Sequence, residues 1–160
     1  MDASSPHIKR ATGADADRVN TLIHASSAYH GEYAPILDGY RLSTEYLELH
    51  PTYLAVDEDD TLMGFYSLLV DPATLARHDF DVPELNLLFV DDRLQGKGIG
   101  RMLIGHMLDL ARSEGLTEIR VVSNPPAEAF YRSVGAEWTG TVPPSPPRVT
   151  WERPELRFRL

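Results

Sequence analysis

The chain has 160 residues and no cysteine, and its 15 Lys and Arg against 24 Asp and Glu give a formal net charge of −9 at pH 7. This length predicts a single domain over residues 1–160 with a core of its own. The lack of cysteine excludes disulfides, thiolate metal sites and a cysteine nucleophile, and the negative charge argues against a nucleic-acid partner. No stretch, the N-terminal segment included, approaches the roughly 20 apolar residues of a membrane span. We therefore expect a cytoplasmic protein without a membrane partner.

The first half of the chain predicts a strand, two helices and a β-hairpin. Apolar spacing, caps and turn residues indicate, in order, a strand at 7–12, a helix capped by Asp15 or Asp17, a loop or broken helix at 26–40, a short helix capped by Ser43 or Thr44, and a hairpin at 52–70. The acidic run Asp57–Asp60 lies between the two apolar runs of the hairpin. We interpret it as a solvated turn rather than a metal site, because acidic residues are frequent in tight turns.

The second half alternates strands and helices. The expected elements are a long connection at 71–83, a strand at 84–90, a helix that ends near Arg112, a strand at 118–123, a short helix at 126–134, a strand at 136–141, a stiff proline loop at 143–147 and a last strand at 155–160. Interleaved strands and helices predict an α/β or α+β sheet that helices cover.

The segment RLQGKGIGRML (93–103) concentrates glycines where a strand meets a helix. Its spacing fits neither a P-loop nor a dinucleotide fingerprint, which leaves the pattern Gln95-x-x-Gly98-x-Gly100. A helix start has free N–H groups and the positive end of the helix dipole, and glycines let a ligand approach those groups closely. The segment therefore predicts a phosphate-binding turn, with a tightly packed turn as the alternative.

This pattern resembles the acyl-CoA-binding motif Gln/Arg-x-x-Gly-x-Gly/Ala of the GNAT superfamily of N-acyltransferases. A second segment, Asn124-Pro-Pro-Ala-Glu-Ala-Phe-Tyr131 followed by Gly135, is similar to the Asn-x-x-Ala-x-x-Phe-Tyr run of the same family. The resemblance implies an α+β fold with a mixed, mostly antiparallel twisted sheet of six or seven strands and about four flanking helices. It also implies a V-shaped split between the strands at 84–90 and 118–123.

The same resemblance implies acetyl-CoA as co-substrate in that split, and no metal. The pyrophosphate would lie on the backbone amides of the glycine segment and the pantetheine arm against the strand at 84–90. The implied contact residues are Leu88, Val90, Gln95, Gly96, Lys97, Gly98, Ile99, Gly100, Arg101 and Asn124.

Two residues are candidates for acid–base chemistry. By similarity Tyr131 would donate a proton to the departing thiolate, because a phenol with a pKa near 10 is protonated at neutral pH. Glu84, at a position where protein-acetylating members of the family resemble this chain in placing a catalytic Glu, would act as general base through water. The alternative is a Glu at the edge of the strand that is only solvated or pairs with an Arg. Period-two alternation predicts Glu84, Asn86 and Leu88 on the cleft face of the strand and Leu85, Leu87 and Phe89 on the other face.

We expect an N-acetyltransferase that acts on the primary amine of a small molecule by direct attack in a ternary complex. Two alternatives stay open: a protein or peptide N-acetyltransferase that modifies an N-terminus or a lysine, and a non-catalytic acyl-CoA-binding module. Dimers are frequent in the family, so the resemblance is compatible with a homodimer.

Overall fold

The computed structural model describes residues 6–160, and the first five residues of the N-terminal segment discussed above lie outside the described residues. Its strands are β1 (His7–Arg10), β2 (Thr52–Val56), β3 (Leu62–Leu69), β4 (Glu84–Val90), β5 (Glu118–Val122), β6 (Glu137–Val142) and β7 (Arg153–Arg159). Its α-helices are α1 (Ala16–Ala25), α2 (Thr44–Leu49), α3 (Pro72–Arg77), α4 (Ile99–Ser113) and α5 (Glu128–Ser133). The 3₁₀ segments η2 (Ser27–Tyr29), η3 (Gly31–Leu37) and η5 (Pro125–Ala127) border the site described below.

The strands form one sheet in the order β1-β2-β3-β4-β5-β7-β6, with every neighbouring pair antiparallel except β4 and β5. The predicted mixed, mostly antiparallel α+β fold is confirmed. The parallel pair β4–β5 is joined only through Glu84 and Arg120, next to a hydrogen bond from Arg120 N to Pro83 O at 2.9 Å. Beyond this point the two strands lose their pairing, so the sheet opens at the place where the V-shaped split was predicted.

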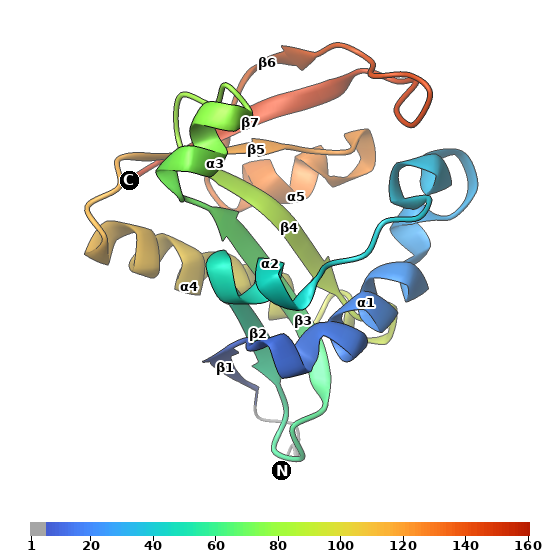
Figure 1. Ribbon diagram of the computed structural model, residues 1–160, viewed down its shortest axis with the longest axis vertical. Coiled ribbons are helices and arrows are strands. Elements are labelled where there is room, and N and C mark those ends of the chain that lie inside the picture. Colours follow the sequence, from blue (N-terminus) through green and yellow to red (C-terminus); the bar gives the residue numbers. More distant parts are fainter. Residues whose placement is uncertain (1–5) are drawn as a thin grey trace.

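Helices cover the sheet from both sides, and each side has its own core (Figure 1). On one side α4 and α5 pack against the sheet through residues such as Leu103 and Met107, both fully buried. On the other side α1 and α2 pack against β2–β4 around Phe65, which is also fully buried. The 3₁₀ segments that follow α1 reach toward the loop between β6 and β7 (Figure 1).

The start of α2 is capped as predicted, whereas the start of α1 is capped differently from the prediction. Ser43 caps α2 as predicted, since its hydroxyl accepts a hydrogen bond from Tyr46 N at 3.0 Å. Before α1 a capping box forms one turn earlier than expected: the Thr12 side chain accepts from Ala14 N, and Asp15 accepts from Thr12 N at 2.8 Å. Asp15 thus stabilises the helix start by a reciprocal bond rather than as a simple cap.

The connection at 71–83 contains a helix, α3, that the sequence analysis did not predict. The Asp71 carboxylate accepts from Thr74 N at 3.1 Å, and Pro72 occupies the first turn. Asp before Pro is a helix-start signal, but six residues give too short a period to distinguish a helix from a turn.

A β-bulge in β4 makes the alternation predicted for this strand wrong. Ser67 pairs with Leu87 and Leu68 with Leu85, so Asn86 is an extra residue on β4. An extra residue exchanges the two faces for every position beyond it. Leu85 consequently packs in the core under α4, whereas Phe89 packs in the core under α1.

Candidate active site

A cavity of about 600 Å³ lies where β4 and β5 separate. Its walls come from β4, the glycine turn with the start of α4, the end of β5, and η5 with α5. The predicted site residues that line it are Leu88, Val90, Gln95, Gly96, Gly98, Ile99, Gly100, Arg101, Asn124 and Tyr131. Lys97, in the same turn, and Glu84, at the closed end of the split, do not line it.

The glycine turn opens backbone amides to this cavity. Gly96 and Gly98 have φ values of +80° and +83°, and a Cβ on either would meet no other atom within 4 Å. Gly98 is the N-cap of α4, a helix of 15 residues, and the N–H groups of its first turn have no intrahelical acceptor. The helix dipole adds positive potential at the same place. The geometry of the turn is therefore suited to an anion.

Gly100 has a different role from the other two glycines. A Cβ at this position would lie 3.1 Å from Cζ of Phe130, so α4 and α5 approach each other at a distance that suits glycine best. Close packing, the alternative interpretation of the glycine segment, thus applies at Gly100. The first two glycines open the turn, and the third allows close packing.

The edge of β4 offers further backbone groups to the cavity. Asp91 N, directly after β4, donates to Met63 O of β3 at 2.9 Å, on the β3 side of the strand. Because successive residues of a strand direct their N–H and C=O to opposite sides, Phe89 faces β3, and Leu88 and Val90 face the split. Gln95 Nε2 donates to Val90 O at 3.2 Å from the glycine turn, in agreement with this orientation.

Asn124 brings an unused donor to the cavity wall. Its Oδ1 accepts from Trp151 Nε1 at 3.3 Å, whereas its buried Nδ2 has no hydrogen-bond partner among the described residues. Buried polar groups almost always have a partner. The amide is therefore suited to a ligand that carries a hydrogen-bond acceptor.

Tyr131 places a buried phenol in the same cavity. The residue is 8% exposed, and its ring meets Phe130 edge to face at 5.4 Å. Burial raises the pKa of Tyr131 well above its ordinary value, and the neighbouring Tyr29 adds to the rise. The phenol stays protonated over the whole physiological range, as a proton donor requires.

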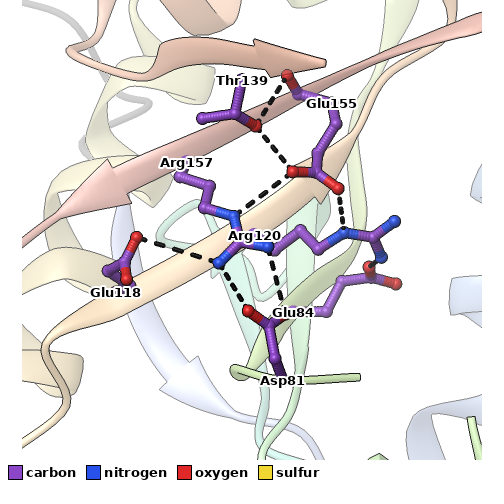
Figure 2. A network of polar contacts seen from close by, with 7 residues as sticks. All are labelled: Asp81, Glu84, Glu118, Arg120, Thr139, Glu155 and Arg157. Carbon is purple, nitrogen blue, oxygen red and sulfur yellow. Dashed lines mark hydrogen bonds and ion pairs between the residues drawn. The ribbon is translucent and has the colours of Figure 1, made fainter. Parts of the chain in front are cut away.

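Glu84 belongs to a network of ion pairs at the closed end of the split (Figure 2). Its carboxylate accepts from Arg120 Nη1, and Arg120 Nε donates to Glu155 Oε2 at 2.7 Å. Burial raises the pKa of Glu84, and the Arg120 charge opposes this rise. Glu84 lies on the side of β4 opposite to Leu88 because of the bulge, so the expectation that both share the cleft face is wrong.

Trp151, which donates to Asn124 of the cavity wall, and Arg153 were missed by the sequence analysis. The Trp151 ring packs edge to face on Tyr33 of η3 at 4.9 Å, so it joins the β6–β7 loop to the segment after α1. Arg153 follows two residues later at the start of β7. Their only local signal is an aromatic and a basic residue after a proline loop, and this signal is too common to predict a site.

Within residues 6–160, no group of three or more His, Asp or Glu side chains is arranged to hold a metal ion. The same part of the chain contains no helix with the length and apolar character needed to cross a membrane.

Comparison with known proteins gives consistent matches. Residues 19–136 match the sequence model of the Acetyltransferase (GNAT) family. The chain is 30% identical over 115 residues to the peptidyl-lysine N-acetyltransferase YjaB of Salmonella typhimurium, covering 72% of this chain and 66% of that protein. It is 33% identical over 98 residues to the mycothiol acetyltransferase of Segniliparus rotundus, covering 59% of this chain and 36% of that protein.

The matched segments thus span less than two thirds of these relatives' own lengths. Among solved structures, the PaiA N-acetyltransferase of Thermoplasma acidophilum in complex with coenzyme A superposes with a TM-score of 0.72 at 19% identity. The superposition covers 98% of this chain and 99% of that one, so the two share a fold throughout.

Proposed function

Because the chain belongs to the acetyltransferase (GNAT) family, we propose that it transfers an acetyl group from acetyl-CoA to a primary amine by direct attack in a ternary complex. One observation carries this proposal: a single cavity joins the open backbone of the glycine turn, the unpartnered amide of Asn124 and the protonated phenol of Tyr131. The chain has no cysteine that could carry the acetyl group covalently, in keeping with direct attack.

The proposed binding of acetyl-CoA uses the whole length of the cavity. The open amides at Gly96, Gly98 and the first turn of α4 would hold the pyrophosphate, with the charges of Lys97 and Arg101 beside it. The free edge of β4 at Leu88 and Val90 would pair with the amides of the pantetheine arm. Nδ2 of Asn124 would donate to the same arm, which would give this buried group its missing partner.

In the proposed reaction, acetyl-CoA supplies the acetyl group as a thioester. The amine forms an N–C bond to the acetyl carbon as the C–S bond breaks, and Leu88 N–H donates to the carbonyl oxygen as negative charge develops there. Tyr131 donates its phenolic proton to the departing sulfur. Glu84 takes the proton of the amine through water, and burial favours this role because it raises the pKa of the carboxyl.

For the acceptor we propose a small primary amine. The contact between Tyr33 and Trp151 joins two loops near the cavity, and we expect it to restrict the approach of a polypeptide. Acetylation of a peptide lysine is the second candidate, and it is favoured by the similarity to YjaB, whose name states that activity.

Two measurements test the proposal. Isothermal titration of acetyl-CoA should give saturable binding that Gly98→Asp abolishes, because a carboxylate would repel the pyrophosphate. Gly105→Asp is the matched control, since Gly105 lies within α4 with open space around it. This substitution should leave the affinity for acetyl-CoA unchanged. Release of free CoA should then be followed over a panel of polyamines, amino acids, aminoglycosides and lysine peptides. Absence of acetyl-CoA binding would refute the proposal, and binding without release on any amine would indicate a non-catalytic module.

A further inference from the structure

Arg153 is a half-buried cation with an unused donor. Its Nε is buried without a hydrogen-bond partner, and none of its nitrogens lies within 4.0 Å of a carboxylate oxygen of residues 6–160. Burial lowers the pKa of Arg153, which shows that removal from water opposes its charge. A guanidinium in such a place ordinarily has an anionic partner.

The position of Arg153 is set by β7. Ser123 N donates to Pro154 O at 3.0 Å, so the start of β7 runs beside the end of β5, where Asn124 lines the cavity. Residues two apart on a strand share a face, so Arg153 lies on the same face as Glu155, a member of the network in Figure 2. The register of β5 and β7 thus places the backbone of Arg153 level with Asn124 at the cavity wall, two residues before Glu155.

The positive charge of Arg153 acts on the half-buried Tyr29 and on the buried Glu84. Burial raises the pKa values of Tyr29 and Glu84, and in both residues the positive charge of Arg153 opposes the rise. Tyr29 lines the cavity and packs on Phe89 of β4 at 5.3 Å. Arg153 is therefore near Tyr29 of the cavity wall and near Glu84, the proposed base.

The carboxylates of the chain itself leave Arg153 without a pair. Glu84 accepts from Arg120, and Glu155 accepts from Arg120, Arg157 and the hydroxyl of Thr139. Figure 2 shows these acids directed toward Arg120 and Arg157. An anion that pairs with Arg153 has to come from a ligand.

We propose that Arg153 binds a carboxylate of the acceptor, so that the substrates of this site are primary amines that also carry a carboxylate. The inference rests on the proposed acetyl transfer and narrows its acceptor class: plain polyamines are excluded. The carboxylate can belong to a free amino acid or to an acidic residue beside the N-terminus of a peptide, and the guanidinium binds both through the same paired N–H donors.

The test compares pairs of acceptors in which a carboxamide replaces the carboxylate. The probes are glycine, β-alanine and L-lysine against their carboxamides, and a hexapeptide with Asp at its second position against the same peptide with Asn. For the wild type, kcat/KM should be higher for each carboxylate, and Arg153→Gln should lower it by about 10- to 100-fold for the carboxylates while the carboxamides change little. Arg153→Lys should keep part of the preference. Arg159→Gln, an exposed arginine of the same strand, should behave as the wild type.

Binding gives a second readout that does not depend on turnover. Each probe is titrated into protein saturated with free CoA. The carboxylate probes should bind the wild type but not the Arg153→Gln variant. The variant should keep the affinity of the wild type for acetyl-CoA. Equal use and equal binding of carboxylates and carboxamides would overturn the inference but leave acetyl transfer intact. Loss of acetyl-CoA binding in the wild type would refute the proposed function instead. A preference limited to the amino acids or to the peptide identifies the source of the carboxylate.

Discussion

Tyr131 and Glu84 are both buried, and burial raises the pKa of each side chain. For Tyr131 the rise keeps the phenol protonated, which suits a donor to a departing thiolate. For Glu84 the same rise makes the carboxylate a stronger base, although Arg120 opposes it. One physical cause, burial, thus favours both proposed roles, which transfer protons in opposite directions.

Replacement of Tyr131 by Phe removes the proposed acid and little else. The ring and its edge-to-face contact with Phe130 are preserved, so the affinity for acetyl-CoA should stay within about twofold. Because general acid catalysis contributes roughly 100-fold or more, kcat should fall by on the order of 100-fold. Pre-steady-state and steady-state CoA release measure the effect. Full turnover of Tyr131→Phe at fixed pH and acceptor would remove the phenol from the mechanism.

Replacement of Glu84 by Gln should change the pH dependence of the reaction. The carboxylate accepts a proton only when ionised, so wild-type kcat/KM should fall as the pH drops through the raised pKa of Glu84. Glu84→Gln should be slow at every pH and lack this acidic limb. The profile is measured with one acceptor amine at saturating acetyl-CoA. An identical acidic limb in wild type and variant would assign the base to another group.

At the scale of single elements, the prediction from sequence was accurate where a pattern is local. The hairpin, α4 with its glycine start, and the Ser43 cap all follow from neighbouring residues. The faces of β4 were predicted wrongly because the bulge at Asn86 depends on pairing with β3. Nothing in the run ELNLLFV itself indicates an extra residue.

The two helical glycines of α4 should respond differently to alanine. Gly105 is surrounded by open space, so Gly105→Ala should stabilise the fold by about 1 kcal/mol through helix propensity. At Gly100 the new Cβ would lie 3.1 Å from the Phe130 ring, and the resulting strain of about 1 kcal/mol or more should cancel the same gain. Urea unfolding followed by circular dichroism measures both free energies. An equal gain at both positions would show that α5 moves freely away from α4.

At the scale of the whole molecule, the sheet consists of two parts that meet at β4 and β5 through one residue pair. Side chains reinforce this junction: Arg120 of β5 bonds Glu84 of β4 and Glu155 of β7 (Figure 2). The sequence indicated an Arg partner for Glu84 only as an alternative. Arg120 lies 36 residues away from Glu84 and 35 from Glu155, and sequence spacing over such distances predicts no contact.

Removal of Arg120 should therefore weaken the junction between the two parts. Arg120→Met keeps an apolar stem but leaves the buried carboxylate of Glu84 without its partner, at a cost of about 3 kcal/mol of unfolding free energy at pH 7. Without the guanidinium the pKa of Glu84 rises further. A carboxyl whose pKa is higher in the folded state stabilises that state when protonated and loses this contribution as the pH increases through its folded value. The loss of unfolding free energy should thus be smaller at pH 5 than at pH 7.

A second substitution tests the cause of this loss. Glu84→Gln in the Arg120→Met background should recover part of the lost unfolding free energy, because an amide is buried at a lower cost than an unpaired charge. Urea unfolding of the two single variants and the double variant at both pH values completes the cycle. Additive losses that do not depend on pH would mean that the strands, and not the ion pair, hold the two parts together.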